Sequence, residues 1–320
     1  RLCNRNKVTK GDYSRDLDRV AQQSGAIPSL WGCSYTDRAR ALPEKTRLTD
    51  EPLVIQTAFF AIACYSLGAL LQWRSFTDRT EIAPRWIRLL GLTGLVAQTL
   101  HLRGLILTPL GIDLGLFHVV SAVAASMVLM TLAASLREPM DNLFILILPL
   151  AALSTLLGAV LKSPYQPFPT PSPGLTLHII SSVLAYSLLA VAAFQALLLA
   201  FQNRQLKARH GWKLLRHLPP LETMEKLLFQ LIRFGLLLLT LAIVSGALSL
   251  ENLFAQHLAH KTILSLIAWC IFAALLWGRH RFGWRGSTAV RWTLFGFLAL
   301  MLAFYGSKLV LELILHRPNP

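Results

Sequence analysis

The sequence has little charge and few cysteines, and both shortages limit what the protein can be. Charged residues make up only 15% of the 320 residues, whereas hydrophobic residues make up 54%. The four cysteines form no Cys-x-x-Cys pair and no spacing typical of zinc ligands; they are Cys3, Cys33, Cys64 and Cys270. Thiol redox chemistry, covalent c-type haem attachment and structural zinc are therefore poorly supported.

Acidic residues are missing from the middle of the long apolar runs. Several of these runs are about 20 residues long, the length that crosses the hydrocarbon layer as a helix. The composition therefore predicts an all-α, polytopic membrane helix bundle. Because no Asp or Glu falls at mid-depth in any run, the sequence argues against a proton-driven carrier or pump.

From Pro52 onward the sequence predicts eight membrane-spanning helices. They cover residues 53–73, 89–109, 115–135, 142–161, 177–200, 229–249, 261–278 and 292–312. We expect these spans to form one transmembrane domain, residues 53–316. Residues 1–50 are polar and lack helical periodicity, so they are predicted to be a disordered extension or a segment that is not part of the working protein.

Basic residues are divided unequally between the two sides of the predicted membrane domain. The loops after the first, third, fifth and seventh spans carry 15 Lys and Arg, and the opposite loops with the C-terminal tail carry 4. The positive-inside rule places the first group in the cytoplasm, so both termini are predicted to face outward. The ten basic residues of the first 50 contradict this assignment, so either the extension is not part of the working protein or the count of spans is off by one. The division of 15 against 4 favours the first alternative.

Two connecting segments have a distinctive composition. Residues 162–176, KSPYQPFPTPSPGLT, contain five prolines and are predicted to form an extended strap that does not join a helix. Residues 203–230 combine a basic half, Pro219-Pro220 and an amphipathic run. This second segment is either a helix lying on anionic lipid before the sixth span or a solvated basic loop that only fixes topology. In the last span, Lys308 and Glu312 are four residues apart and are expected to pair.

Histidines are concentrated at the predicted outer face. Six of the nine lie at or near it: His101, His118, His178, His257, His260 and His316. Neutral imidazole is a common axial ligand of haem iron, and two helices that end at one depth can each offer one. His178, which begins the fifth span, and His316, which follows the eighth, fit that geometry. The alternative is that these histidines are ordinary interfacial residues, and spacing alone leaves both interpretations open.

The last third of the chain resembles the cytochrome c assembly family, whose members include CcsA, CcmC, HemX-like and YpjD-like membrane proteins. The resemblance lies in LHIISSVLAYSLLAVAAFQALLLAFQ at 177–202, HKTILSLIAWCIFAALLWGRHRFGWRG at 260–286 and GFLALMLAFYGSKLVLELIL at 296–315. The turn RFGWRG, residues 281–286, is its most specific part. The chain looks most similar to the YpjD-like branch, which implies a multi-pass protein of the bacterial inner membrane.

The resemblance also implies a site and shows one departure from the family pattern. Haem-handling members use histidines at the outer ends of two late helices as axial ligands, and His178 matches the first while His316 falls near the second. Those members carry a segment W-G-x-x-W-x-W-D in the outer loop before the next-to-last helix, where aromatic faces stack on porphyrin. Here that loop, residues 249–261, reads SLENLFAQHLAHK and has no Trp. Either His257 and His260 replace part of the binding chemistry or they are polar surface residues.

Three functions are compatible with these observations, and none is an enzyme. In the first, the protein handles haem b at the outer face during cytochrome c maturation. His178 and His316 would bind its iron, His260 would assist, and the partners would be the lipid bilayer and other assembly proteins or an apocytochrome, with no nucleic acid. The second is a HemX-like regulatory or scaffolding role without haem. The third, a transporter, is disfavoured by the lack of acidic residues at mid-depth in the spans.

Overall fold

The computed structural model describes residues 44–77, 83–108, 111–161, 172–207, 219–249 and 259–306, with the backbone alone at 44–52, 108, 111, 259–260 and 305–306. Within these ranges, eight helices are long and apolar enough to cross a membrane. The prediction of an all-α bundle with eight spans is therefore confirmed. The chain divides into two units, residues 1–51 and 52–320, and the helical bundle belongs to the second.

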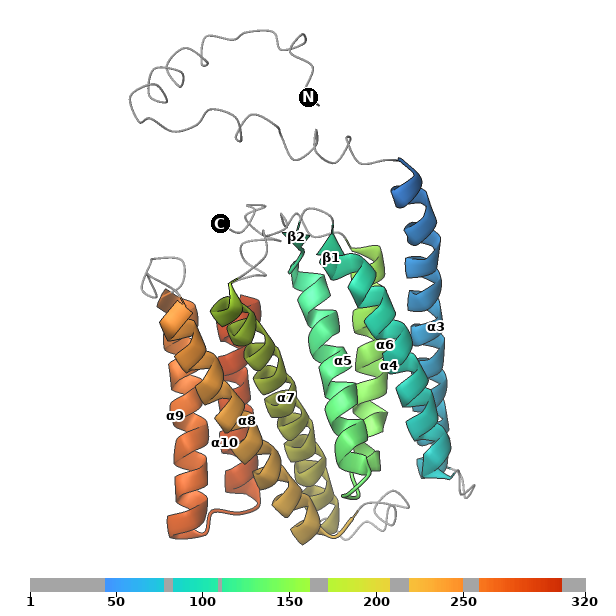
Figure 1. Cartoon of the computed structure of the whole chain (residues 1–320). Helices are drawn as coiled ribbons and strands as arrows, with labels where there is room; N and C mark the ends of the chain where they lie inside the picture. The colour runs from blue at the N-terminus through green and yellow to red at the C-terminus, as the bar shows by residue number, and fades with distance from the viewer. Residues whose placement is uncertain are drawn as a thin grey trace, which may run out of the picture. The chain divides into compact units, whose positions relative to one another are not determined.

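The eight spanning helices follow one another in an antiparallel order (Figure 1). They are α3 (Glu44–Thr77), α4 (Pro84–Ile106), α5 (Leu116–Ser135), α6 (Phe144–Val160), α7 (Pro173–Lys207), α8 (Leu221–Ser249), α9 (Ala259–Phe282) and α10 (Ser287–Met301). A two-stranded hairpin, formed by β1 (Leu107–Thr108) and β2 (Gly111–Ile112), joins α4 to α5. A 3₁₀ turn, Asp141–Leu143, precedes α6, and a π-helical turn, Leu302–Gly306, continues α10.

The alternation of directions gives the bundle two ends with different side chains. We call the end where α4 and α8 finish and α5 and α7 begin the histidine end, since His101, His118 and His178 lie there. The opposite end, where α3, α5, α7 and α9 finish, is called the arginine end. The last turns there carry Arg74, Arg204, Lys207, Arg279 and Arg281. The sequence predicted this segregation from the charge asymmetry of the loops.

Several helix boundaries differ from the prediction. The amphipathic run after Pro220 is the first part of α8, which continues without a break to Ser249. Residues 221–228 are therefore neither a separate surface helix nor a loop, the two alternatives that the sequence left open. The end of the predicted strap is also wrong, because Pro173–Thr176 form the first turn of α7. A proline costs nothing at that position, since the first amide of a helix has no intrahelical acceptor. Helix α3 begins at Glu44, before the predicted start of the first span at residue 53. Residues 1–43, Lys308 and Glu312 lie outside the described residues.

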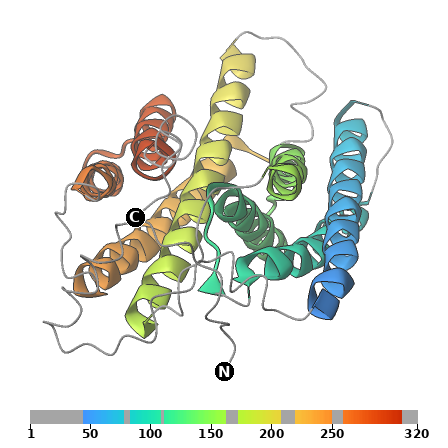
Figure 2. The ribbon, with the colours of Figure 1, turned by 90° about the horizontal axis from the view of Figure 1, so that it is seen from above.

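Helix α7 lies at the centre of the bundle and contacts α5, α8 and α10 (Figure 2). Its middle, Ala190–Ala193, is buried on all sides, which is why this segment reads as a continuous apolar run. Small residues let α8 approach closely: a Cβ added at Gly235 would come within 2.7 Å of the Leu189 side chain. The outer surfaces of the helices expose large apolar side chains such as Phe59, Phe234 and Leu248, as expected of a surface that faces lipid.

At the arginine end, a buried carboxylate fixes the turn between α9 and α10. Glu225 of α8 accepts a 2.6 Å hydrogen bond from the Gly286 amide and lies 3.5 Å from Arg285 Nε. Gly283 and Gly286 have φ of +65° and +56°, a backbone region that favours glycine. The backbone conformation of the turn RFGWRG therefore explains its two glycines, and the hydrogen bond to Glu225 holds the turn in place.

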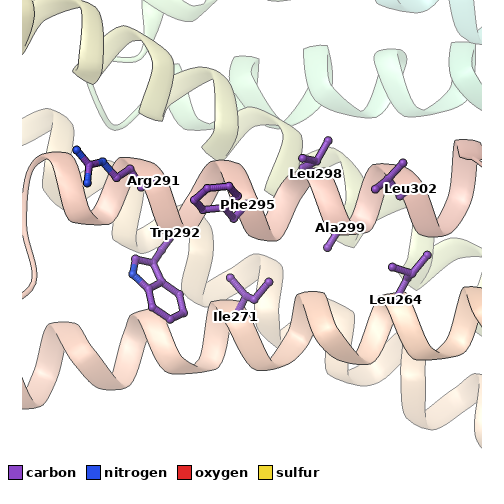
Figure 3. A pocket seen from close by; sticks show the side chains of 8 residues that line it. All are labelled: Leu264, Ile271, Arg291, Trp292, Phe295, Leu298, Ala299 and Leu302. Carbon is purple, nitrogen blue, oxygen red and sulfur yellow. The ribbon is translucent and has the colours of Figure 1, made fainter.

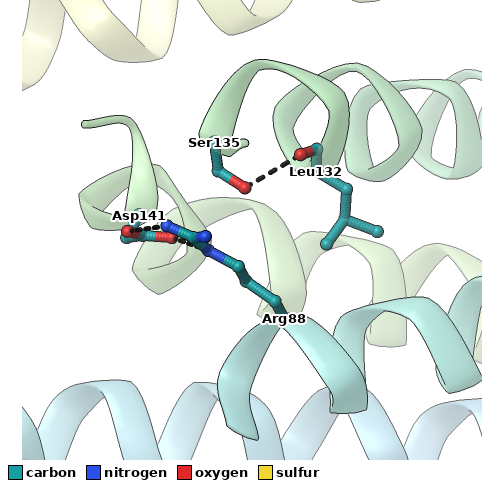
Figure 4. Close-up of polar contacts among 4 residues, drawn as sticks. All are labelled: Arg88, Leu132, Ser135 and Asp141. Carbon is teal, nitrogen blue, oxygen red and sulfur yellow. Dashed lines mark hydrogen bonds and ion pairs between the residues drawn. The ribbon is translucent and has the colours of Figure 1, made fainter. Parts of the chain in front are cut away.

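A second ion pair joins α4 to the connection between α5 and α6 (Figure 4). Arg88 donates from Nε and Nη2 to the two carboxylate oxygens of Asp141 at 2.8 and 2.7 Å. This bidentate geometry is the strongest that an arginine and a carboxylate form. Beside it, Ser135 donates to the Leu132 carbonyl at 2.9 Å in the last turn of α5.

Candidate functional site at the histidine end

His178 stands in the second turn of α7 and faces α8. Its Nδ1 lies 2.7 Å from the carbonyl oxygen of Ala242. A carbonyl only accepts, so Nδ1 must carry the proton and donate. The ring is then in the tautomer whose Nε2 keeps a lone pair. Such a hydrogen bond from Nδ1 is how proteins orient a histidine that binds metal through Nε2.

Small residues on α8 hold the ring of His178 in place. A Cβ added at Gly246 would lie 2.8 Å from Nδ1 of His178, so the imidazole packs directly on the helix backbone. One turn nearer the start of α7, Gly174 lies close to the side chain of Ser249 on α8, where an added Cβ would also collide. His178 is half-buried. A side chain that is fixed by a hydrogen bond and by packing loses little entropy when its free nitrogen binds a ligand.

His101, near the end of α4, has the same arrangement in a fully buried setting. Its Nδ1 lies 2.8 Å from the carbonyl oxygen of Val54 in α3, and the residue is 1% exposed. Its Nε2 is buried and has no hydrogen-bond partner among the described residues. Buried polar atoms without partners are rare and call for an explanation. His101 was predicted to lie at the outer face, but it was not among the predicted ligands.

His118 and Asp113 lie beside His101 at the start of α5. The Nδ1 of His118 is 3.5 Å from Asp113 Oδ1, and the same oxygen accepts a 2.9 Å hydrogen bond from the Gly115 amide. The two imidazoles are close enough to interact electrostatically. The hairpin formed by β1 and β2 brings them together, because it reverses the chain within six residues between α4 and α5. The short connection between the two predicted spans is the sequence signal that places these two histidines near each other.

A polar network continues from His101 toward the middle of the bundle. Gln98, one turn earlier on α4, accepts a 2.7 Å hydrogen bond from the Tyr65 hydroxyl and donates to Ser121 Oγ at 3.0 Å. Gly94 makes room for the tyrosine, since a Cβ there would lie 2.6 Å from the ring. Gln98 is fully buried. The network links α3, α4 and α5 and ties α4 to its neighbours one turn from His101.

The other predicted site residues are only partly within the described ranges. His316 and His257 lie outside them, and for His260, the second residue of α9, the backbone alone is described. The pairing of His178 with His316 therefore stays a prediction. Across the described ranges, no group of three or more His, Cys, Asp or Glu side chains could hold a metal ion. Among the described residues, a metal ion at this end would therefore meet single imidazoles rather than a cluster.

Comparison with known proteins assigns the chain to a family. The family model described as "Cytochrome C assembly protein" matches residues 86–315, more than two thirds of the sequence. The chain belongs to this family. The match covers α4 to α10, which includes His101, His118 and His178 and the turn held by Glu225.

Individual relatives agree with that assignment. The chain is 31% identical over 262 residues to the inner membrane protein YpjD of Escherichia coli K12. This alignment covers 80% of this chain and 98% of the relative. It is 26% identical over 131 residues to protein HemX of Brevibacillus brevis, or 40% of this chain and 48% of HemX. Over 87 residues it is 32% identical to the cytochrome c biogenesis protein CcsA of Gloeobacter violaceus, about a quarter of each chain. No solved structure matches the chain.

The predicted family and its YpjD-like branch are thereby confirmed. This member of the cytochrome c assembly family is an integral, multi-pass membrane protein whose helices contact the lipid bilayer. Two of the segments that carry the resemblance are thereby placed: residues 177–202 lie within α7, and residues 260–286 comprise nearly all of α9 and the turn that follows it.

Proposed function

We propose that this protein binds haem b at the histidine end and handles it in cytochrome c maturation, with His178 as one axial ligand. The observation that carries the proposal is the 2.7 Å hydrogen bond from His178 Nδ1 to the Ala242 carbonyl. It leaves Nε2 as the nitrogen with a lone pair, which is what haem iron requires of a histidine ligand. The family assignment supplies the link to cytochrome c assembly.

The residues of the histidine end fit such a ligand. Bound haem would supply an iron with two axial positions and a flat, largely apolar ring. His178 would hold the iron from α7, and His316 is the proposed second ligand, with His260 as an assisting residue. On the adjoining surface of α7, Leu177 and Ile180 are 47% and 53% exposed, so the helix presents apolar side chains at the depth of His178.

The wider role follows from where the site lies. By the positive-inside rule the arginine end is cytoplasmic, so the histidine end and both termini would face outward from the inner membrane. Haem held there would be presented to an apocytochrome or to other assembly proteins. The protein would act by binding and presentation and would not be an enzyme.

A second candidate is a HemX-like scaffolding or regulatory role without haem. The sequence of the loop at 249–261 favours it, since that loop lacks the tryptophans that would stack on porphyrin. The two candidates differ in one property, which is whether the purified protein holds haem.

An absorption spectrum of the detergent-purified protein, before and after addition of haemin, tests the proposal. We expect a Soret band with bis-histidine features that His178→Ala removes or converts. His280→Ala is the matched control, because His280 is an exposed histidine at the arginine end. If the protein stays colourless and takes up no haemin, the scaffolding role replaces this proposal.

A further inference from the structure

A groove runs along the outer surface of the bundle between α9 and α10 (Figure 3). Its volume is about 570 Å³, within the range of small-molecule sites. Seven of the eight residues that line it are apolar, and the eighth is Arg291. Phe295, Leu298 and Leu302 are more than half exposed, so the groove opens toward the space that lipid occupies.

The length of the groove corresponds to one leaflet of a bilayer. On α10 and the π-helical turn that continues it, the lining runs from Arg291 to Leu302, 11 residues apart, with Ile271 and Leu264 facing them from α9 (Figure 3). At 1.5 Å per residue this distance is about 16 Å. Half of a hydrocarbon core of about 30 Å is about 15 Å. The groove thus extends from the membrane boundary at the arginine end to the middle of the membrane.

The charged end of the groove has the features of a headgroup site. Arg291 is exposed and forms no ion pair with an acidic side chain among the described residues. Trp292 follows it and packs on Trp284, with ring centroids 5.1 Å apart. Tryptophan and arginine are the side chains that accumulate at the level of lipid headgroups. A free guanidinium at that depth is complementary to a phosphate.

We propose that this groove binds one acyl chain of an anionic phospholipid, whose phosphate pairs with Arg291. The acyl chain lies along Phe295, Leu298 and Ala299 and reaches Leu302 in the middle of the membrane. The site occupies the leaflet at the arginine end, so it is separate from the histidines and does not depend on whether haem binds there.

Native mass spectrometry of the delipidated protein in detergent tests this site. Phosphatidylglycerol and phosphatidylcholine with identical acyl chains are titrated separately, and the Kd of the first bound lipid is measured. One basic residue near a membrane surface changes lipid affinity by about fivefold. We therefore expect phosphatidylglycerol to bind about fivefold more tightly than phosphatidylcholine, and Arg291→Gln to abolish this preference. Ala299→Phe, which fills the groove, should weaken the binding of both lipids.

Arg74 provides the matched control. It is an exposed arginine in the last turn of α3, at the same end of the bundle and next to the exposed Trp73, but it does not line the groove. Arg74→Gln should leave both Kd values unchanged. Three results would overturn the proposal: equal Kd values for the two lipids in the wild type, a preference that survives in Arg291→Gln, or an equal loss in Arg74→Gln. A change of oligomeric mass in Ala299→Phe with unchanged lipid binding would assign the groove to a second copy of the chain instead.

Discussion

Replacing Glu225 should destabilise the protein through a defined set of contacts. This carboxylate is 7% exposed, accepts the 2.6 Å hydrogen bond from the Gly286 amide, and has Arg285 and Arg279 at 3.5 and 3.9 Å. In Glu225→Ala the amide of Gly286 loses its acceptor, and nothing else among these contacts replaces it.

The contacts give the size of the effect. A hydrogen bond to a charged group contributes about 1.5–3 kcal/mol. Arg285 is 58% exposed, so its pairing adds only about 0.2–1 kcal/mol. Arg279 keeps its position over the Phe229 ring at 4.6 Å and its hydrogen bond to the Trp284 carbonyl. We therefore expect Glu225→Ala to lower the free energy of unfolding by about 2–4 kcal/mol, with a smaller loss for Glu225→Gln, whose amide oxygen still accepts from Gly286.

Thermal denaturation in detergent measures this effect, with the remaining monodisperse protein quantified by size-exclusion chromatography after heating. A loss of about 2–4 kcal/mol corresponds to a Tm lower by roughly 5–15 °C. Glu222→Gln is the control, since Glu222 is exposed in the first turn of the same helix. A Tm for Glu225→Ala equal to that of Glu222→Gln would refute the conclusion that Glu225 fixes the α9 to α10 turn.

Three further changes test other parts of the structure. Gly246→Leu should lower the free energy of unfolding by about 1–3 kcal/mol, because the new side chain displaces the His178 ring. In the control Gly158→Ala the added Cβ lies 3.7 Å from its nearest neighbour, so this variant should melt like the wild type. Equal melting of the two variants would contradict the packing described. Arg88→Gln should lower stability by about 1 kcal/mol because the pair with Asp141 is partly exposed, and a charge-exchanged pair, Arg88→Asp with Asp141→Arg, should recover part of the loss in a thermal melt. A reporter fused after Pro320 should work only if it is active outside the cytoplasm, and activity of a cytoplasmic reporter there would reverse the orientation.

The fold could largely be predicted because membrane spans carry a strong one-dimensional signal. Runs of about 20 apolar residues identified all eight helices, and the arginines of the loops separated the two ends. Helix ends were harder: the sequence before residue 229 is amphipathic, and nothing in it distinguishes a surface helix from the start of α8. In the structure this part of α8 is joined to the α9 to α10 turn by the hydrogen bond between Glu225 and Gly286. The two residues are 61 positions apart, so the contact cannot be read from the local sequence.

The candidate site was predictable in kind but not in detail. The position of His178 at the start of a span pointed to the histidine end. Its tautomer, however, depends on the hydrogen bond to the Ala242 carbonyl. The corresponding hydrogen bond of His101 goes to the carbonyl of Val54, 47 residues earlier in the chain. Such contacts between helices leave no pattern in a single sequence, because their partners are backbone carbonyls that every residue possesses.

Electron paramagnetic resonance of the haemin-loaded protein tests the central claim most directly. We predict a low-spin ferric signal of bis-histidine type in the wild type, its loss in His178→Gly, and its return when free imidazole is added to that variant, because imidazole can occupy the position of the missing side chain. A low-spin signal in His178→Gly that equals the wild type without imidazole would contradict the assignment of His178 as an axial ligand.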